Sequence, residues 1–480
     1  MNYKMIRNVL GWILLFEAAF MVIPLVTSLC FSEWKTALSF LLSIAVCCAV
    51  GGLCVAFKPR SKTLYAKEGF VIVSLSWIVL SLFGALPFLF SGTTTSFVDA
   101  LFETASGFTT TGASIFREVE PLSKGILMWR SFTHWVGGMG VLVFVMAFIP
   151  LSGGQNMHIM KAESPGPSVS KLVPRVRTTA MLLYSIYVIL TAAQFILLLF
   201  GGVPPFEALN LAFSTAGTGG FGFLNDSLAS FSSYVQIVVA VFMLLFSVNF
   251  TSYYLVLRGR LKEGLNTEVR AFFLIVLAAV TVVTLDIMRA GHYESAFEGI
   301  KHALFSVSTV ISTTGFATAD FNLWPTVSRV ILVLLMFVGA CAGSTGGGIK
   351  VSRFVILFKS IGREMSHMLH PRQIKNTTVD GKSVDDDTVH SVLVFIAAYV
   401  LVFAASILLV GLDGKDLETT FTAVAATINN IGPGLGEVGP AGNYAGLSVL
   451  SKLVLTFDML AGRLELFPML LLFSPKTWKK

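Results

Sequence analysis

The feature that most limits how this chain can fold is a series of ten apolar stretches. A helix needs roughly 20 apolar residues to cross the hydrocarbon core of a bilayer. The stretches occupy about residues 9–31, 36–57, 69–91, 125–151, 179–202, 233–257, 271–288, 327–357, 389–412 and 444–473. Because backbone polar groups inside a bilayer must be satisfied within the segment, these stretches are predicted to be helices of an all-α integral membrane protein.

The composition supports the membrane class and argues against other classes of protein. Of the 480 residues, 55% are hydrophobic and 13% are charged, whereas a soluble domain carries roughly 25% charged residues. The net charge is +7, but the positive residues lie in short connectors and not on one face of a soluble domain. We therefore predict a lipid environment and no nucleic-acid partner. We find no nucleophile–base pair and no paired catalytic carboxylates, and predict no enzymatic activity.

The distribution of Lys and Arg predicts the orientation of the chain in the membrane. With the N-terminus inside, the inner segments are 1–8, 58–68, 152–178, 258–270, 358–388 and 474–480. These segments hold 22 Lys and Arg residues, whereas the outer connectors hold six. Positive residues accumulate on the cytoplasmic side of membrane proteins. The sequence therefore predicts a multi-pass protein of the cytoplasmic membrane with both termini in the cytoplasm.

Four of the outer connectors share one plan. Each has a half-length apolar segment that begins with an acid, then a stretch rich in Thr and Gly, and then a polar return. The acids are Asp99, Glu207, Glu298 and Glu418, and the glycines are Gly112, Gly220, Gly315 and Gly432. The distance from acid to glycine is 13, 13, 17 and 14 residues, so the third half-helix is expected to be longer by about one turn. Glycines that recur at intervals of about 100 residues indicate repeats within one chain.

These connectors contain the residue types that a filter for a dehydrated monovalent cation needs. Irregular backbone at membrane depth is tolerated where it lines a polar cavity. Carbonyl oxygens that point at an ion can replace its water shell, and glycine tolerates the unusual backbone angles that this requires. One loop supplies too few oxygens, so we expect all four to surround one axis. The predicted filter residues are Thr110, Thr111, Gly112, Thr218, Gly219, Gly220, Thr313, Thr314, Gly315, Asn430, Ile431 and Gly432.

The sequence resembles the Trk/Ktr/HKT superfamily of potassium transporters, and in particular its TrkH-type potassium-translocating subunits. The matching stretches are Ala105–Gly112, Gly219–Phe221, Ser312–Phe316, Cys341–Lys350, Asn429–Gly436 and Gly462–Glu465. The likeness covers nearly the whole chain, including the two helices at the N-terminus. One departure is Ala216-Gly217-Thr218, where bulkier residues are expected. This departure leaves the register of the second loop open.

The resemblance implies potassium uptake across the inner membrane, with K⁺ as the transported ion. It also implies a homodimer with one pore per protomer, regulated by a cytosolic nucleotide-binding subunit of the TrkA type. Two alternatives are a secondary carrier for another solute and a less selective transporter of Na⁺ and K⁺. A carrier fold would show two inverted halves, whereas the four units here run in the same direction.

A glycine-rich interruption and one arginine are candidate gate elements. Gly343, Ser344, Thr345, Gly346, Gly347 and Gly348 interrupt the eighth apolar stretch, and each glycine inside a helix costs about 1 kcal/mol. The resemblance implies an intramembrane gating loop here, which Lys350 follows; a simple kink for packing is the alternative. Arg463 lies inside the last apolar stretch, where a charge must face water or a partner. We interpret it as a pore-facing charge beside the loop, with an ion pair to Asp458 or Glu465 as the alternative.

These features predict a fold of four pseudo-repeats, each made of a helix, a pore half-helix, a filter loop and a second helix, around a central pore. Two transmembrane helices precede the repeats. The expected segments are 1–60 for the two N-terminal helices, 61–178 for repeat one, 179–268 for repeat two, 269–385 for repeat three with the intramembrane loop, and 386–480 for repeat four.

Overall fold

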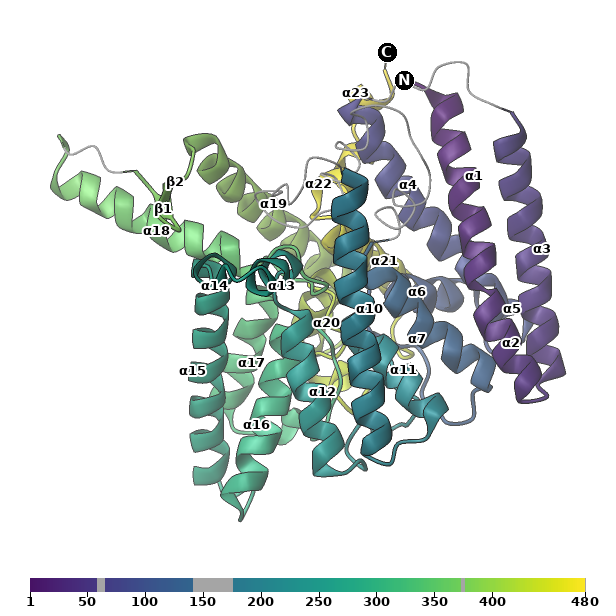
Figure 1. Cartoon of the computed structure of the whole chain (residues 1–480), viewed down its shortest axis with the longest axis horizontal. Helices are drawn as coiled ribbons and strands as arrows, with labels where there is room; N and C mark the ends of the chain where they lie inside the picture. The colour runs from purple at the N-terminus through teal and green to yellow at the C-terminus, as the bar shows by residue number, and fades with distance from the viewer. Residues whose placement is uncertain (58–64, 141–175, 373–375, 480) are drawn as a thin grey trace.

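A computed structural model describes residues 1–57, 65–140, 176–372 and 376–479 (Figure 1). Three predicted features extend beyond these residues: most of the connector 58–68, most of the connector 152–178, and the second half of the apolar stretch 125–151. The described residues are mainly helical, and their only strands form one short hairpin. The predicted all-α fold class is therefore confirmed.

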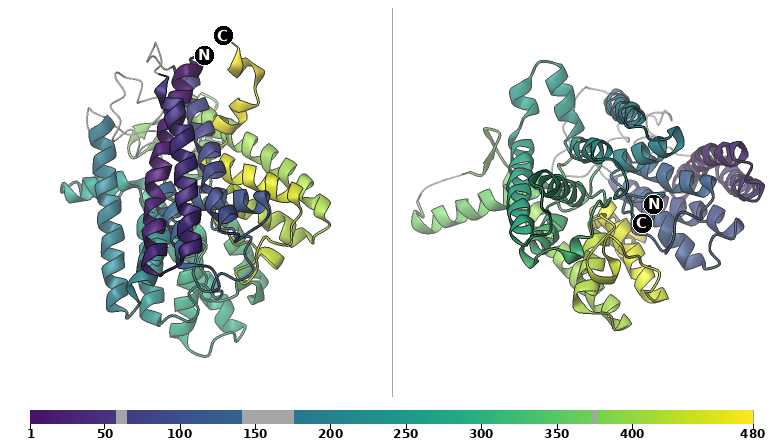
Figure 2. Two further views of the ribbon diagram at one scale, coloured as in Figure 1. Left: turned by 90° about the vertical axis from the view of Figure 1, so that its right-hand side faces the viewer. Right: turned by 90° about the horizontal axis from the view of Figure 1, so that it is seen from below.

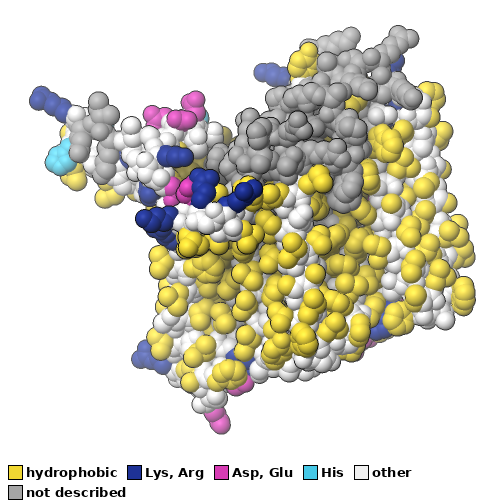
Figure 3. All heavy atoms as spheres, in the orientation of Figure 1, with side chains coloured by type: hydrophobic (Ala, Val, Ile, Leu, Met, Phe, Trp, Pro, Cys, Tyr) yellow, Lys and Arg dark blue, Asp and Glu magenta, His cyan; other side chains and the backbone are white. Residues whose placement is uncertain are grey.

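Long apolar helices form the outer part of the molecule. Among the described residues, six helical segments are long and apolar enough to cross a membrane. They are built from α1 (Tyr3–Phe20) with α2 (Val22–Cys30), α3 (Trp34–Ala56), α4 (Ala66–Gly84) with α5 (Leu86–Phe90), α10 (Val176–Phe200), α15 (Thr267–Arg289), and α19 (Asp386–Val410) with η2 (Gly411–Asp413). Leu277 of α15 is 66% exposed and Leu401 of α19 is 72% exposed. The band of hydrophobic side chains in Figure 3 is the surface that lipid would cover.

Four half-length helices lie between the long ones, where the sequence predicts them. They are α6 (Phe97–Phe108), α11 (Pro205–Ala216), α16 (Ala296–Ile311) and α20 (Leu417–Ile428). Three have 12 residues, and α16 has 16, so the predicted extra turn is confirmed. Each begins with its predicted acid in the first turn, where a negative charge is stabilised by the positive end of the helix dipole.

The apolar stretch 233–257 does not form the single helix that was predicted. It forms α12 (Ser233–Phe246) and α13 (Phe250–Leu257), whose axes differ by 91°. The side chain of Asn249 accepts a hydrogen bond from the amide of Thr251 and so caps α13. The amide of Phe250 donates to the carbonyl of Gly343. A polar cap and a tertiary contact therefore end the first helix inside an apolar sequence.

Two other apolar stretches are broken as well. Stretch 327–357 forms α17 (Thr326–Val338) and α18 (Val351–Leu369), and the break covers 339–350, which is longer than the predicted 343–348. Stretch 444–473 was predicted as one span, but it forms α21 (Val449–Arg463) and α22 (Phe467–Leu472). Glu465 and Leu466 between these two helices have φ of 56° and 64°. Such left-handed residues end a right-handed helix.

The remaining elements complete the described chain. They are α7 (Lys124–Gly138), α14 (Leu261–Gly264), η1 (Phe321–Leu323), η3 (Gly436–Val438), α23 (Pro475–Trp478) and the antiparallel strands β1 (Thr378–Val379) and β2 (Lys382–Ser383). Thr378 pairs with Ser383 in the hairpin. Both chain termini lie at one end of the molecule, while α18 and the hairpin extend from its side (Figures 1 and 2).

The N-terminal helices pack against the first half-helix through a buried aromatic cluster. Trp129 of α7 lies 5.8 Å from the ring of Phe108 and 6.2 Å from that of Phe40, measured between ring centres. Its indole Nε1 donates a 3.0 Å hydrogen bond to the carbonyl of Gly84. This core joins α3, α4, α6 and α7, and it fixes the position of the first filter loop.

Candidate functional site

The four predicted filter loops have the same backbone conformation. The second residue after each half-helix is left-handed, with φ of 55° to 60° at Thr110, Thr218, Thr313 and Asn430. The glycine two residues later also has positive φ, from 78° to 96° at Gly112, Gly220, Gly315 and Gly432. This shared pattern aligns Gly220 with the other three glycines and so assigns the register of the second loop.

The four glycines lie in a closed ring. A Cβ atom added to any of them would come within 3.0 Å of a carbonyl oxygen of the next loop, which is closer than real Cβ atoms approach. The pairs are Gly112 with Gly219, Gly220 with Thr314, Gly315 with Ile431, and Gly432 with Thr111. Each carbonyl belongs to the residue just before a ring glycine, and the pairs follow the order of the chain. The structure thus brings together loops that are far apart in the sequence.

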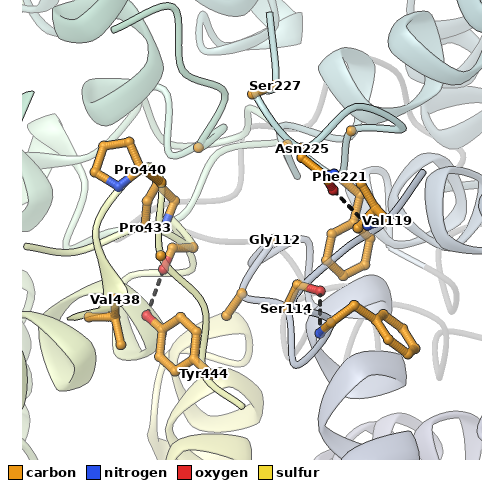
Figure 4. A pocket seen from close by; sticks show the side chains of 18 of the residues that line it. Gly112, Ser114, Val119, Phe221, Asn225, Ser227, Pro433, Val438, Pro440 and Tyr444 are labelled. Atoms are coloured by element: carbon orange, nitrogen blue, oxygen red, sulfur yellow. Dashed lines mark hydrogen bonds between the residues drawn. The ribbon is translucent and has the colours of Figure 1, made fainter. Parts of the chain in front are cut away.

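A pocket leads to this ring from one side, and all four ring glycines line it (Figure 4). Tyr444 donates a 2.6 Å hydrogen bond to the carbonyl of Gly432. The amide of Val119 donates a 2.8 Å hydrogen bond to the side chain of Asn225, which joins the segments that follow the first and second loops. We call this pocket the vestibule; its polar walls suit an ion that still carries water.

A buried ion pair supports the wall of the vestibule. Nε of Arg130 lies 2.8 Å from a carboxylate oxygen of Glu103, and both side chains are almost fully buried. The guanidinium lies 4.1 Å from the ring centre of Phe221 and donates to the carbonyl of Gly222. Arg130 therefore connects α6 and α7 to the second loop. The sequence analysis did not identify this pair, because Glu103 and Arg130 belong to different elements and neither stands in a motif.

Hydroxyl groups stiffen the first and third loops from within. The side chains of Thr109 and Thr111 form a 2.8 Å hydrogen bond, and those of Ser312 and Thr314 form one of 2.7 Å. In the fourth loop, the side-chain nitrogen Nδ2 of Asn430 donates instead to the hydroxyl of Thr111, 3.0 Å away. These contacts hold the loop backbones in place, while the hydroxyl of Thr110 and the side-chain oxygen of Asn430 have no hydrogen-bond partner among the described residues.

The loop 339–350 lies directly beneath the filter loops. The amide of Gly347 donates to the hydroxyl of Thr313, 2.6 Å away, and the amide of Gly348 donates to the carbonyl of Asn429. The amide of Cys341 donates to the carbonyl of Ser247, at the bend between α12 and α13. We call this segment, which contains the predicted Gly343, Ser344, Thr345, Gly346, Gly347, Gly348 and Lys350, the intramembrane loop. It contacts the bend between α12 and α13 and the third and fourth filter loops.

Arg463 connects the intramembrane loop to the end of α7. Its guanidinium donates to the carbonyl of Thr345 at 2.8 Å and to the carbonyls of Gly137 and Gly138 at 2.5 and 2.8 Å. The prediction that Arg463 lies beside the loop agrees with this contact. Of the two acids considered as its partner, Glu465 forms an ion pair with Arg353, and Asp458 accepts a 2.7 Å hydrogen bond from Ser406.

Two more residues hold the ends of the intramembrane loop. The ammonium of Lys350 donates to the carbonyl of Gly346, and Lys350 itself has a φ of 83°. Glu268, which is buried, accepts hydrogen bonds from the amide of Ala342 at 2.7 Å and of Ser352 at 3.1 Å. The sequence analysis missed Glu268; its only local signal is an acid just before the apolar stretch 271–288.

Side chains offer no alternative centre for a metal ion in the described part of the chain. Residues 1–57, 65–140, 176–372 and 376–479 contain no group of three or more His, Cys, Asp or Glu side chains that could hold one. At the glycine ring, a backbone carbonyl of each loop packs against the glycine of another loop. Such a site suits a weakly hydrated cation that must enter and leave.

Comparison with known proteins gives one consistent result. The family model TrkH, described as a cation transport protein, matches residues 37–480. The Trk system potassium uptake protein TrkH of Salmonella typhimurium is 36% identical over 486 residues, and that of Escherichia coli K12 is 35% identical over 488 residues; both alignments cover all of each chain. The crystal structure of the potassium transporter TrkH from Vibrio parahaemolyticus matches with a TM-score of 0.90 and 34% identity, and covers all of both chains.

Proposed function

Because the chain belongs to the TrkH family of cation transport proteins, we propose that it takes up potassium across the cytoplasmic membrane. The observation that carries this proposal is the closed ring of Gly112, Gly220, Gly315 and Gly432 at the base of the vestibule. Its relatives carry the names of potassium uptake proteins, so the activity assigned here is transport and not catalysis.

Potassium enters the vestibule with its water and loses that water at the glycine ring. Backbone carbonyls then take the place of the water oxygens. The carbonyls belong to the filter residues Thr110-Thr111-Gly112, Thr218-Gly219-Gly220, Thr313-Thr314-Gly315 and Asn430-Ile431-Gly432. The four half-helices end at these loops, and each helix places a partial negative charge of about half an elementary charge at its C-terminus. This arrangement favours a cation over an anion at the ring.

The intramembrane loop closes the path below the ring. Hydrogen bonds from Gly347 and Gly348 hold it against the third and fourth filter loops, which supports a path that is closed to a hydrated ion in this direction. Arg463 adds a positive charge at the same level and binds the carbonyl of Thr345. Opening requires the segment 343–348, with Lys350 and Arg463, to move away from the axis.

The chain acts in the inner membrane as a multi-pass component of a Trk system. We assign it a homodimeric state with one pore per protomer, and a cytosolic nucleotide-binding partner of the TrkA type. Both termini face the cytoplasm in this proposal, in line with the 22 Lys and Arg residues of the inner segments and with termini that lie at one end of the molecule (Figure 2). The five segments 1–60, 61–178, 179–268, 269–385 and 386–480 are its units.

Growth and flux together test the proposed function. Expression in a host that lacks potassium uptake should restore growth at low potassium. Purified protein in liposomes should then carry K⁺ in preference to Na⁺. Equal flux of both ions would support the less selective transporter, and movement of neither ion by folded protein in the liposomes would contradict a cation path. A Gly112→Ala variant is the matched negative control, because its added Cβ overlaps the Gly219 carbonyl.

A further inference from the structure

The second filter loop lacks the internal brace that the first and third loops have. Those loops carry a hydroxyl residue three positions before the ring glycine and another directly before it, and the two hydroxyls form a hydrogen bond. At the same two positions the second loop has Gly217 and Gly219. Glycine has the largest conformational freedom of any residue. Each ring glycine follows one peptide that faces the next loop. Without further support, the Gly219 peptide would be the least restrained of these four peptides.

His134 of α7 occupies the space that these missing side chains leave. A Cβ atom on Gly219 would lie within 3.0 Å of three atoms of the His134 ring, and a Cβ on Gly217 would meet the backbone carbonyl of His134. The imidazole is fully buried and stacks on Phe221, with ring centres 4.3 Å apart and planes inclined by 19°. The ring is therefore clamped between Phe221 and the backbone of the second loop.

The imidazole of His134 restrains the second loop through packing and not through hydrogen bonds. Neither ring nitrogen of His134 has a hydrogen-bond partner in the part of the chain that the structure describes. Gly219 in turn faces Gly112, whose absent side chain would overlap the Gly219 carbonyl oxygen. A fixed chain of contacts thus leads from the imidazole to the carbonyl that faces the first loop.

We propose that His134 is a positioning residue for the filter: its ring replaces the missing brace of the second loop and holds the Gly219 carbonyl in the glycine ring. The inference rests on the proposed function and adds a residue that helps to set ion selectivity. A carbonyl that turns away from the axis offers fewer oxygens to K⁺, and the site then discriminates less well against the smaller Na⁺. At Gly217, the departure at Ala216-Gly217-Thr218 in the sequence has the same explanation, because a side chain there would overlap the backbone carbonyl of His134 in α7.

The first experiment compares two substitutions at His134, and one control substitution at the next residue, in liposomes. His134→Ala should reduce the preference for K⁺ over Na⁺ by about tenfold, which corresponds to about 1.4 kcal/mol. His134→Phe keeps a flat ring without nitrogens and should retain most of the preference. Trp135→Phe, on the next residue of α7, is the control for general damage to the helix, and its preference should equal that of the unaltered protein.

The second experiment exchanges volume between the two residues. Gly219→Thr gives the second loop the side chain of the first and third loops, and it should abolish potassium uptake while His134 is present. The double variant His134→Gly with Gly219→Thr creates space for the new side chain and should recover uptake and K⁺ preference above either single variant. This rescue can be measured even if His134→Ala fails to fold.

The outcomes separate this inference from the proposed function. If the unaltered protein moves no potassium, the proposed function fails. If it moves potassium selectively and His134→Ala is folded and equally selective, the inference is wrong while the function stands. A double variant no better than Gly219→Thr alone would likewise overturn the inference. Loss of preference in His134→Phe equal to that in His134→Ala would show that shape is not the property that matters, and would also overturn it.

Discussion

The backbone amide of Gly347 donates a 2.6 Å hydrogen bond to the hydroxyl of Thr313, which joins the intramembrane loop to the third filter loop. Thr313 also holds the left-handed turn of its own loop, with a φ of 60°. In the proposed function, the same residue therefore belongs both to the ion site and to the contact that closes the path below it. Movement of the loop would break this hydrogen bond, so we predict that conduction and filter geometry are coupled.

Shortening the segment 343–348 should raise potassium flux. The segment fills the space beneath the filter through its contacts with Thr313, Asn429 and Arg463, and a shorter loop cannot maintain all three. Flux into liposomes and single-channel current measure the effect. Removal of Gly291, a turn residue with no atom near its absent Cβ, is the control for a shortened chain. Unchanged flux and unchanged current in the shortened loop would count against a gate.

Replacing Arg463 with alanine should also increase flux, by about tenfold if the charge adds ~1.4 kcal/mol to the barrier. The substitution removes a positive charge and the hydrogen bonds to Thr345, Gly137 and Gly138. Arg463→Lys keeps the charge and should stay closer to the original flux. If Arg463→Ala lowers the melting temperature and leaves flux per folded molecule unchanged, the arginine has a structural role only.

Gly112→Ala should eliminate uptake, whereas Gly202→Ala should not. Both glycines have nearly the same backbone angle, with φ of 79° and 78°, so alanine pays about 1 to 2 kcal/mol of backbone strain at either site. Only at Gly112 does the new Cβ overlap a carbonyl of another filter loop; at Gly202 there is no atom within 4 Å. The two variants are compared by their growth at low potassium and by the amount of folded protein that each yields. Equal uptake by both variants would contradict a tight ring.

Acid should weaken the start of α20. Hydrogen bonds from Thr419 lower the pKa of the Asp416 carboxyl, which caps this half-helix at the membrane surface. A lowered pKa means that the stabilisation is complete at neutral pH and is lost as the pH falls below about 4. Asp416→Ala should cost about 1 kcal/mol at pH 7, while Asp416→Asn keeps a capping side chain. Thermal unfolding in detergent at pH 7 and at about pH 3 tests this: Asp416→Ala should lose less stability on acidification than the original.

The half-helices were predictable because their signals are local. An acid, an apolar segment and a Thr/Gly stretch occur together within about 20 residues, and they repeat four times. The extra turn of α16 followed from the spacing between Glu298 and Gly315 alone. The positions of the long helices along the chain were predictable from the apolar stretches, because a helix that crosses the bilayer needs a stretch of one typical length.

The breaks and the supporting contacts were not predictable, because their causes lie far away in the sequence. The bend at Ser247–Asn249 has polar residues but no glycine or proline to mark it, and it depends on contacts with the intramembrane loop. His134 and Glu268 resemble ordinary helix residues, and their partners Gly219 and Ala342 lie more than 70 positions away. The turn at Glu465 and Leu466 has no glycine to mark it.

The ring of glycines is assembled from a single polypeptide, and this gives the chain a freedom that a pore of four identical subunits lacks. In a symmetric tetramer, any substitution appears in every quadrant at once. Here Gly219 has no side chain and the imidazole of His134 lies in that space, while Thr111 and Thr314 carry side chains at the matching positions of the first and third loops. Ion preference in such a molecule can be adjusted one quarter at a time.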